Sequence, residues 1–396
     1  MANWMEMEHR YYMQVSRRQP IVIVRGQGTR VWDEAGKEYL DFTAGWAVNS
    51  LGHCHPALVQ AVQEQAGTLI QTSNQFYSIP QLKLAQLLVE NSCLDRAFFA
   101  NSGAEANEGA VKLARKYGRT HRNGAYQVIT ALNSFHGRTM SMVAATGQPR
   151  YQEQWHPLTP GFVNVPYDDI NAIKQATNVE TCAVMLEPVQ GEGGVNVPSP
   201  RYLKQVREWC DEQNLVMILD EVQTGIGRLG TLFGYQQFGV EPDAITLAKG
   251  LGGGVPIGAL LAKEKFCLLA PGDHGSTFGG NALTCAAAFA TVDYVIRNDI
   301  SAHVRAMGQR LQKGLNALKS RHQIITQVRG MGLLLAFELG GDISPQVVSL
   351  CNENGLLLNP LRPNALRLMP PLTITPQEVD LGLERLERAL SQLTAS

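Results

Sequence analysis

The sequence lacks an excess of charge of either sign, and it lacks any apolar run long enough to cross a membrane. Its 34 Lys and Arg residues nearly balance its 35 Asp and Glu residues, so it has no basic footprint for nucleic acid or anionic lipid. The longest uncharged stretch near membrane length, residues 275–292, is rich in Gly, Ser, Thr and Asn. We therefore predict the start of a buried helix there, and expect neither a membrane nor a nucleic acid as partner.

The sequence also leads us to expect neither a secretory signal nor paired cysteines. Residues 1–19 mix charges with aromatic residues and lack an apolar core before a cleavage site. The 7 cysteines are scattered without a CxxC motif, which is typical of a reduced, cytoplasmic protein. His53, Cys54 and His55 cannot easily converge on one tetrahedral ion, so we interpret them as loop packing and expect no metal.

Short apolar runs alternate with helical patterns through the middle of the chain. Runs this short and continuous fit strands that are buried on both faces, and the alternation implies crossover connections. The predicted strands are residues 97–100, 127–131, 182–186, 215–219, 244–248 and 257–262, with predicted helices at 104–117 and 200–213. The sequence therefore predicts an α/β fold with a mostly parallel central sheet and helices on both faces. Ligands of such sheets bind at the carboxyl ends of the strands.

The two ends of the chain have a different pattern. Residues 29–42 predict a hairpin around Gly36. Beyond about residue 290, amphipathic helices at 300–321 and 375–393 flank strand-like pieces at 332–338 and 365–369. We therefore predict a smaller α+β domain that is built mainly from the C-terminus and joined by the N-terminal segment.

Lys249 follows the apolar run 244–248 and precedes a glycine-dense loop, and Asp220 follows the run 215–219. Neighbouring strands would then present an amine and a carboxylate at the same edge of the sheet. This combination suits a pyridoxal phosphate enzyme, in which the lysine holds the cofactor as a Schiff base and the aspartate keeps its ring nitrogen protonated. The alternative is a solvated strand end and an ordinary turn.

A possible phosphate site follows the strand at 97–100. Ser102 is a good N-cap for the helix that begins there, and Glu105 stands three residues later, as in a capping box. Helix capping alone would explain these residues. In the functional interpretation, the amides of Gly103 and Ala104 at the helix N-terminus hold a phosphate.

Further polar loops follow other predicted strands. Phe135 is either a core residue or stacks on a flat ring. Arg138 is either solvated or binds a carboxylate in a bidentate way. The glycine-rich loop 187–194 places carboxylates at the same sheet edge, and the turn 273–281 offers hydroxyl groups to a phosphate.

Together these segments resemble the class III (subgroup II) pyridoxal-phosphate-dependent aminotransferases of fold type I, over about residues 20–390. The combination of motifs, in the order of the family, carries the resemblance. The motifs are GHCHP at 52–56, SGAEAN at 102–107, FHGRT at 135–139, EPVQGEGG at 187–194, DEVQTGIGR at 220–228, and LAKG at 247–250 followed by STFGGN at 276–281. The resemblance implies an N-terminal segment at 1–50, a large cofactor-binding domain at 51–285 and a small domain at 286–396.

The resemblance also implies a role for individual residues. Lys249 would form the Schiff base and relay a proton, and Asp220 would pair with the ring nitrogen. The other cofactor-binding residues would be Ser102, Gly103 and Ala104 at the phosphate, Phe135 and Val222 on opposite ring faces, Gln223 near the phenolic oxygen, and Thr277 from the other subunit. The role of Thr277 implies that each active site is completed by both subunits of a homodimer.

Within the class, the chain is most similar to acetylornithine aminotransferases of arginine biosynthesis. These accept N-acetylornithine in one half-reaction and glutamate or 2-oxoglutarate in the other. Arg367 would bind the α-carboxylate of glutamate, and Glu192 would mask Arg367 when the other substrate is bound. Arg138 would bind the distal carboxylate of either substrate, and Ser276 would also contact substrate. Without the motif context, Arg367 could be an exposed strand arginine.

Other activities stay open at this point. Ornithine δ-aminotransferases carry a tyrosine near the position of Gly45, and a glycine there makes room for an acyl group, although Trp46 beside it is bulky. Succinylornithine, ornithine and 4-aminobutyrate aminotransferases are close alternatives, and an aminomutase of the glutamate-semialdehyde type is a remote one. The combination of Lys249 and Asp220 counts against a binding protein without enzymatic activity.

Overall fold

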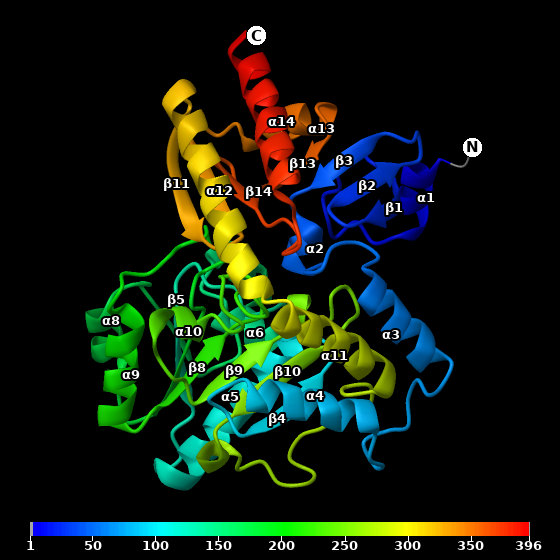
Figure 1. The fold of residues 1–396 in the computed structure, drawn as a ribbon. Coiled ribbons are helices and arrows are strands. Elements are labelled where there is room, and N and C mark those ends of the chain that lie inside the picture. Colours follow the sequence, from blue (N-terminus) through cyan, green and yellow to red (C-terminus); the bar gives the residue numbers. More distant parts are fainter. Residues whose placement is uncertain (1–2, 396) are drawn as a thin grey trace.

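The central sheet contains seven strands in the order β4-β10-β9-β8-β7-β5-β6. The computed structural model describes residues 3–395 (Figure 1). The strands are β4 (Arg96–Ala100), β5 (Gln127–Ala131), β6 (Phe162–Val165), β7 (Thr181–Leu186), β8 (Val216–Asp220), β9 (Ala244–Leu247) and β10 (Gly258–Ala262). β10 runs antiparallel to both of its neighbours, and the other paired strands are parallel. The predicted α/β fold with a mostly parallel sheet is confirmed, and β6 is an additional strand.

Helices bury both faces of this sheet. In β8, Met217 and Leu219 belong to one hydrophobic cluster, whereas Val216 and Ile218 belong to another. Because successive residues of a strand point to opposite faces, the two clusters lie on opposite sides of the sheet. This explains why the strands are continuous apolar runs rather than alternating ones.

The helices around the large sheet follow the predicted alternation with the strands. The first helix after β4, α5 (Gly103–His121), packs against β9 and β10. α11 (Ala282–Arg297) packs against both α3 and α4, so the uncharged stretch 275–292 does contain the start of a partly buried helix. The others are α3 (Pro56–Ala66), α4 (Ile79–Glu90), α6 (Met140–Ala145), α7 (Pro149–Gln152), α8 (Ile170–Ala176), α9 (Tyr202–Gln213) and α10 (Tyr235–Phe238), with short 3-10 turns at Glu153–Trp155, Lys249–Leu251 and Glu264–Phe266.

A smaller unit lies at one end of the large sheet (Figure 1). Its antiparallel sheet has the order β11-β12-β15-β14. These strands are β11 (Ile325–Met331), β12 (Leu334–Leu339), β15 (Ala365–Leu368) and β14 (Asn359–Arg362), and the helices around them are α12 (Ile300–Arg321), α13 (Ser344–Glu353) and α14 (Pro376–Ala395). The predicted strands and helices of this C-terminal part are present, and β11 and β14 were not predicted.

The N-terminal segment joins the smaller unit through a third sheet. Its strands are β1 (Ile23–Gln27), β2 (Arg30–Asp33), β3 (Glu38–Asp41) and β13 (Leu356–Leu357), and the segment also contains α1 (Trp4–Tyr11) and α2 (Ala44–Ala47). β2 and β3 form the predicted hairpin, and β13 pairs with β3 in parallel. The exact division at residues 50 and 285 stays a prediction.

Two predictions from composition can be compared with the structure. All 7 cysteines are free. Within residues 3–395, no helix combines the length and the apolar character needed to cross a membrane.

Candidate active site

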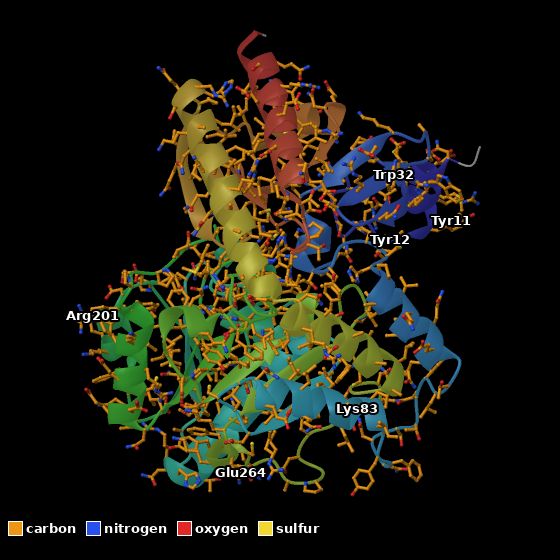
Figure 2. All side chains as sticks on the ribbon, viewed as in Figure 1. Tyr11, Tyr12, Trp32, Lys83, Arg201 and Glu264 are labelled. Carbon is orange, nitrogen blue, oxygen red and sulfur yellow. The ribbon has the colours of Figure 1, made fainter. Side chains whose placement is uncertain are left out.

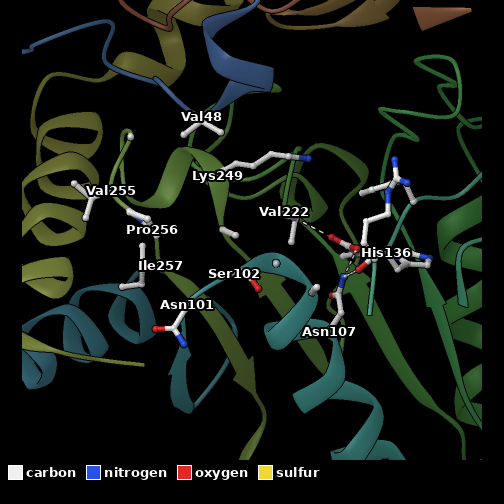
Figure 3. A pocket seen from close by; sticks show the side chains of 18 residues that line it. Val48, Asn101, Ser102, Asn107, His136, Val222, Lys249, Val255, Pro256 and Ile257 are labelled. Carbon is white, nitrogen blue, oxygen red and sulfur yellow. Dashed lines mark hydrogen bonds and ion pairs between the residues drawn. The ribbon is translucent and has the colours of Figure 1, made fainter. Parts of the chain in front are cut away.

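The carboxyl ends of the strands and the start of α5 surround a cavity of about 390 Å³ (Figure 3). Lys249 and Asp220, which follow or end neighbouring strands, both line it. The other predicted residues in its wall are Ser102, Gly103, Ala104, Phe135, Arg138 and Val222. Segments that are far apart in the sequence thus meet at the sheet edge where parallel sheets bind their ligands.

Lys249 lies in a strained turn directly after β9. Its φ is 42°, in the left-handed region that is costly for residues other than glycine. The next residue is held from outside the turn, because the Ser50 hydroxyl donates a hydrogen bond of 2.9 Å to the carbonyl of Gly250. Figure 3 shows the lysine side chain extended into the cavity. The turn therefore directs the amine away from the strand and toward the ligand space.

The surroundings of Lys249 favour a neutral amine. Burial lowers the pKa of Lys249, and the positive charge of Arg367 lowers it further, against the opposing effect of Asp220. A neutral amine is the nucleophilic form that attacks a carbonyl and the basic form that accepts a proton. The pKa shift therefore agrees with the chemistry that the sequence predicted at this residue.

Asp220 is 3% exposed, and three donors hold its carboxylate. Its Oδ2 accepts hydrogen bonds from Nδ2 of Asn107 and Nδ1 of His136, both at 2.8 Å. Its Oδ1 accepts one from the amide of Val222 at 3.0 Å. Asn107 and His136 are functional neighbours that the sequence analysis did not identify, although both lie within quoted motifs (Figure 3).

A second set of contacts orients these donors. Nδ2 of Asn107 also donates to the carbonyl of His136 at 2.7 Å, and its Oδ1 accepts a hydrogen bond from the Thr246 hydroxyl at 2.5 Å. Burial is the largest single effect and lowers the pKa of His136, but the hydrogen bond with Asp220 and the negative charges of Asp220 and Glu187 together raise this pKa above its ordinary value. The raised pKa favours a protonated imidazole opposite the carboxylate of Asp220, an arrangement that supports the negative charge needed opposite a protonated ring nitrogen.

Glu187 is another buried carboxyl that the sequence analysis did not single out. Burial raises the pKa of Glu187 to about 7, against the opposing charge of His136. Its two oxygens accept hydrogen bonds from the amides of Phe135 at 3.2 Å and Gly191 at 3.4 Å. Glu187 thus ties the loop that carries Phe135 to the loop that carries Glu192.

The N-terminus of α5 has the local geometry expected of a phosphate site. Ser102 is the N-cap, and its hydroxyl accepts a hydrogen bond from the amide of Glu105 at 3.2 Å. The capping box is shifted, because the Glu105 carboxylate accepts from the amide of Asn101 at 2.6 Å and so reaches one residue before the cap. A Cβ on Gly103 would come within 2.9 Å of the Val222 methyl groups, so only glycine leaves this approach open. The helix start therefore fits an anion.

Arg367 is fully buried, contrary to the alternative of an exposed strand arginine. Its Nη2 lies 2.9 Å from Oε2 of Glu192, so the predicted pair is formed. Asn359 accepts hydrogen bonds from Nε and Nη2 at 3.1 and 2.7 Å, and Gln223 accepts one from Nη1 at 3.1 Å. Burial lowers the pKa of Arg367, and the charge of Glu192 opposes this effect.

Arg138 lies at the outer side of the cavity. It is exposed, and its guanidinium carbon lies 4.0 Å from the centre of the Tyr151 ring. The ring of Tyr151 also meets Phe135 edge to face, with 5.8 Å between the ring centres. Tyr151 therefore keeps Arg138 close to the predicted ring-stacking residue, a contact that the sequence analysis missed because Tyr151 lies outside the motifs.

Some predicted residues lie beyond the cavity wall within the described part of the chain. Glu192, Gln223 and Arg367 form their own hydrogen-bonded group. Ser276 is connected to the cavity wall through Asn101, whose side-chain amide donates a hydrogen bond of 3.1 Å to the Ser276 hydroxyl. Thr277 is exposed. The roles of all these residues stay predictions. Residues 3–395 contain no cluster of side chains suited to a metal ion.

Comparison with known proteins agrees with this site. Residues 11–390 match the family described as Aminotransferase class-III. The chain belongs to the class III aminotransferase family. It is 51% identical over 387 residues to the acetylornithine aminotransferase of Caldanaerobacter subterraneus subsp. tengcongensis, which covers 98% of both chains. It is 48% identical over 396 residues to that of Methanocaldococcus jannaschii, covering 99% of this chain and 98% of the relative.

Solved structures of aminotransferases share the fold. An ornithine aminotransferase from Toxoplasma gondii, with partial occupancy of PLP at its active site, matches with a TM-score of 0.95 and 35% identity, covering 99% of this chain and 94% of that one. The N-acetylornithine aminotransferase from Stenotrophomonas maltophilia K279a matches with a TM-score of 0.86 and 39% identity, covering 99% of each chain. Pyridoxal phosphate, predicted from the sequence, is the cofactor of this class.

The residues of this chain fit that cofactor. The start of α5 suits its phosphate, the anionic Asp220 suits its ring nitrogen, and the amine of Lys249 suits its aldehyde. Phe135 and Val222 both line the space between these groups. The phosphate, the ring nitrogen and the aldehyde of the cofactor thus each have a chemically suitable group in the wall of the cavity.

An Asp220→Asn variant should keep its fold and its cofactor but lose turnover by about three orders of magnitude, because a neutral amide no longer keeps the ring nitrogen protonated. The measurement is kcat at saturating cofactor, with cofactor content determined by absorbance.

Asp243→Asn is the matched control. Asp243 is 2% exposed and accepts a hydrogen bond of 2.8 Å from the amide of Met217, next to the start of β9 and outside the cavity wall. This variant should lose stability and keep its kcat. Near-normal turnover in Asp220→Asn would show that Asp220 is only a turn residue.

Proposed function

We propose that the enzyme transfers the side-chain amine of N-acetylornithine to 2-oxoglutarate, a step of arginine biosynthesis in the cytoplasm. The ion pair between Glu192 and Arg367 carries this proposal, because it provides a cation that can be masked beside the reactive lysine. The names of the relatives that are about half identical in sequence support the same substrate. The free cysteines agree with a reducing compartment.

When bound, pyridoxal phosphate supplies an electron sink that lets the carbon bearing the amine lose a proton. The chain supplies the groups that bind and move protons around it. The amine of Lys249 accepts the proton at that carbon and returns it at the adjacent position on the cofactor. Asp220 keeps a proton on the ring nitrogen, and the amides at the start of α5 hold the phosphate so that the ring cannot shift.

The two half-reactions present different groups to the same pocket. Glutamate carries a carboxylate next to its reacting amine, and Arg367 binds it once Glu192 has moved away. N-Acetylornithine has only apolar methylene groups next to its reacting amine. When Arg367 is paired with Glu192, the two charges cancel, and this part of the pocket suits those apolar groups. The exposed Arg138 binds the carboxylate at the far end of either substrate.

The loop after β3 is compatible with an acylated donor. Residues Ala44 to Ala47 form a left-handed turn, with φ values of 44°, 61°, 61° and 64°. Val48, directly after this turn, lines the cavity. Trp46 is 58% exposed, so its indole ring does not fill the cavity in this chain. The bulky side chain of Trp46 therefore does not take up the space in the cavity that an acetyl group would need.

A panel of amino donors with 2-oxoglutarate tests the function. N-Acetylornithine should give the highest kcat/KM, by about tenfold or more over ornithine, 4-aminobutyrate and N-succinylornithine, because a matched pocket distinguishes such groups by a few kcal/mol. Lys249→Ala is the control and should show no turnover with any donor while it remains folded. A clear preference for another donor would reassign the substrate.

We further propose that the active enzyme is a homodimer in which Thr277 completes the phosphate site of the partner. Thr277 is exposed and lies outside the cavity wall of its own subunit. Large apolar side chains are exposed on the same loop and on the start of α4, with Phe278 at 62% and Ile79 at 71%. Tyr11 and Tyr12 are also exposed at the edge of the N-terminal part (Figure 2). A second copy of the chain would cover such surfaces.

Subunit mixing tests this arrangement. Thr277→Ala dimers should need more cofactor for half-maximal activity, and Lys249→Ala dimers should be inactive. In a mixed dimer one site combines Lys249 with an intact Thr277, so co-expression should restore a fraction of sites with normal cofactor affinity. Recovery of no such fraction, or full activity of a monomer in sedimentation, would contradict the shared site.

The pair of Glu192 and Arg367 predicts opposite responses in the two half-reactions. In Glu192→Ala, the glutamate half-reaction should survive or improve, and the N-acetylornithine half-reaction should fall. The ratio of the two rates should move by roughly tenfold or more, because the variant removes the carboxylate that neutralises the buried charge of Arg367. Single-turnover spectroscopy with each donor measures this ratio.

Glu192→Gln is the matched variant, since it keeps the size of the side chain and removes its charge. It should shift the ratio in the same direction. Equal losses for both donors would leave Glu192 with a structural role only.

A further inference from the structure

One row of side chains crosses the small sheet and faces the loop that carries Glu192. Arg329 on β11 lies opposite Ala336 on β12, Ala336 lies opposite Arg367 on β15, and Arg367 lies opposite Asn359 on β14. Directly opposed residues of neighbouring strands point to the same face of a sheet. Two arginines thus point from one sheet face, separated by the small, fully buried side chain of Ala336.

Three consecutive residues of the loop each contact a different arginine of this sheet. The carboxylate of Glu192 pairs with Arg367 at 2.9 Å. The carbonyl oxygen of Gly193 accepts a hydrogen bond from Nη2 of Arg362, on β14. The carbonyl oxygen of Gly194 accepts one from Nε of Arg329 at 2.8 Å. Only the first contact involves a charged side chain of the loop, and the other two hold its backbone.

The opposite side of the loop is packed against the large unit. A Cβ on Gly191 would lie 1.8 Å from Oε1 of Gln223, and one on Gly193 would lie 1.9 Å from the carbonyl oxygen of Asn133. Val189 and Val195, which flank the glycines, belong to the same apolar cluster as Ala336. The backbone therefore has little freedom while the two arginines hold it, and Glu192 is presented to Arg367 from a fixed position.

The charges around the two arginines point to the same role. Arg329 pairs with Glu338 at 2.7 Å. Arg362 has no carboxylate partner within residues 3–395, and burial together with the charge of Arg329 lowers the pKa of Arg362. The two neighbouring guanidinium groups repel each other. Hydrogen bonds to backbone carbonyl oxygens offset this repulsion. Those acceptors belong to the loop of Glu192.

We propose that Arg329 and Arg362 are positioning residues that hold Glu192 against Arg367, so that the small sheet sets the preference between N-acetylornithine and glutamate. The proposal rests on the function proposed above. Neither residue touches the reacting atoms. Loss of either bond to the loop backbone releases Glu192 and shifts the pocket toward the form that binds a dicarboxylate.

The test uses Arg329→Gln and Arg362→Gln in the holoenzyme. Single-turnover rates with glutamate and with N-acetylornithine should show a ratio shifted toward glutamate by about threefold to tenfold, which is the net effect of one lost hydrogen bond of ordinary strength. Arg329→Lys and Arg362→Lys keep a donor and should restore part of the shift. These variants also keep the test decisive if a glutamine variant does not fold.

Arg385→Gln is the matched control. Arg385 also donates to a glycine carbonyl, that of Gly355 at 2.7 Å, and also pairs with a glutamate, Glu38 at 3.5 Å, and none of these three residues lines the cavity. Its side chain is 17% exposed, compared with 15% for Arg329. It should leave the rate ratio unchanged. An equal shift in Arg385→Gln would reduce the effect to general destabilisation and overturn the proposal.

A double-mutant cycle separates positioning from a general effect. In a Glu192→Ala background, Arg329→Gln should change the rate ratio no further, because the carboxylate that it positions is absent. An additive shift would overturn the proposal.

Hydrogen exchange provides a readout that does not depend on the donor. Amides of residues 190–197 should exchange about threefold faster or more in both glutamine variants of the substrate-free holoenzyme. If the wild type prefers another donor, the substrate assignment fails. Faster exchange would then still support the proposal that Arg329 and Arg362 hold the loop. Unchanged exchange would overturn the proposal that Arg329 and Arg362 hold the loop, even if N-acetylornithine is the substrate.

Discussion

The hydrogen bonds that converge on the Asp220 carboxylate determine the geometry of the whole site. A buried carboxylate is costly unless its oxygens are bonded, and here the donors come from α5, from the loop after β5 and from the turn after β8. Asn107 lies about one turn beyond the N-terminus of α5, the helix whose first amides are predicted to bind the phosphate. The spacing between the phosphate site and the ring-nitrogen site is therefore built into a single rigid helix.

The fold and the centre of the site were predictable where one feature dominated locally. The strands of the large sheet are continuous apolar runs because both faces are covered, and Lys249 and Asp220 were found because each is a charged residue at the end of such a run. β6 was missed because Asn164 interrupts its apolar pattern, although its amide donates within the sheet to the Thr130 hydroxyl at 2.6 Å. β11 was missed because Gln327 and Arg329 give it the polar pattern of an edge strand.

Contacts made at a distance were not predictable from single residues. A buried histidine or asparagine does not reveal which carboxylate it faces, so the partners of Asp220 emerged only with the structure. The pairing of Glu192 with Arg367 came from the resemblance to a family and not from residue patterns. Because Asn359 and Gln223 also accept hydrogen bonds from Arg367, this buried cation keeps polar partners when Glu192 leaves. The ion pair can therefore open without leaving the Arg367 guanidinium buried and without hydrogen bonds.

The antiparallel strand β10 also has a consequence for how the protein matures. β4, which leads into the predicted phosphate site at the start of α5, hydrogen-bonds to the large sheet through β10, and β10 follows Lys249 in the sequence. During synthesis, the residues after β4 must wait for a strand that emerges from the ribosome much later, and such non-local pairing is slow. A nascent chain that ends before Gly258 therefore holds the lysine without a finished phosphate site. Cofactor capture becomes a late event that marks a completed large domain.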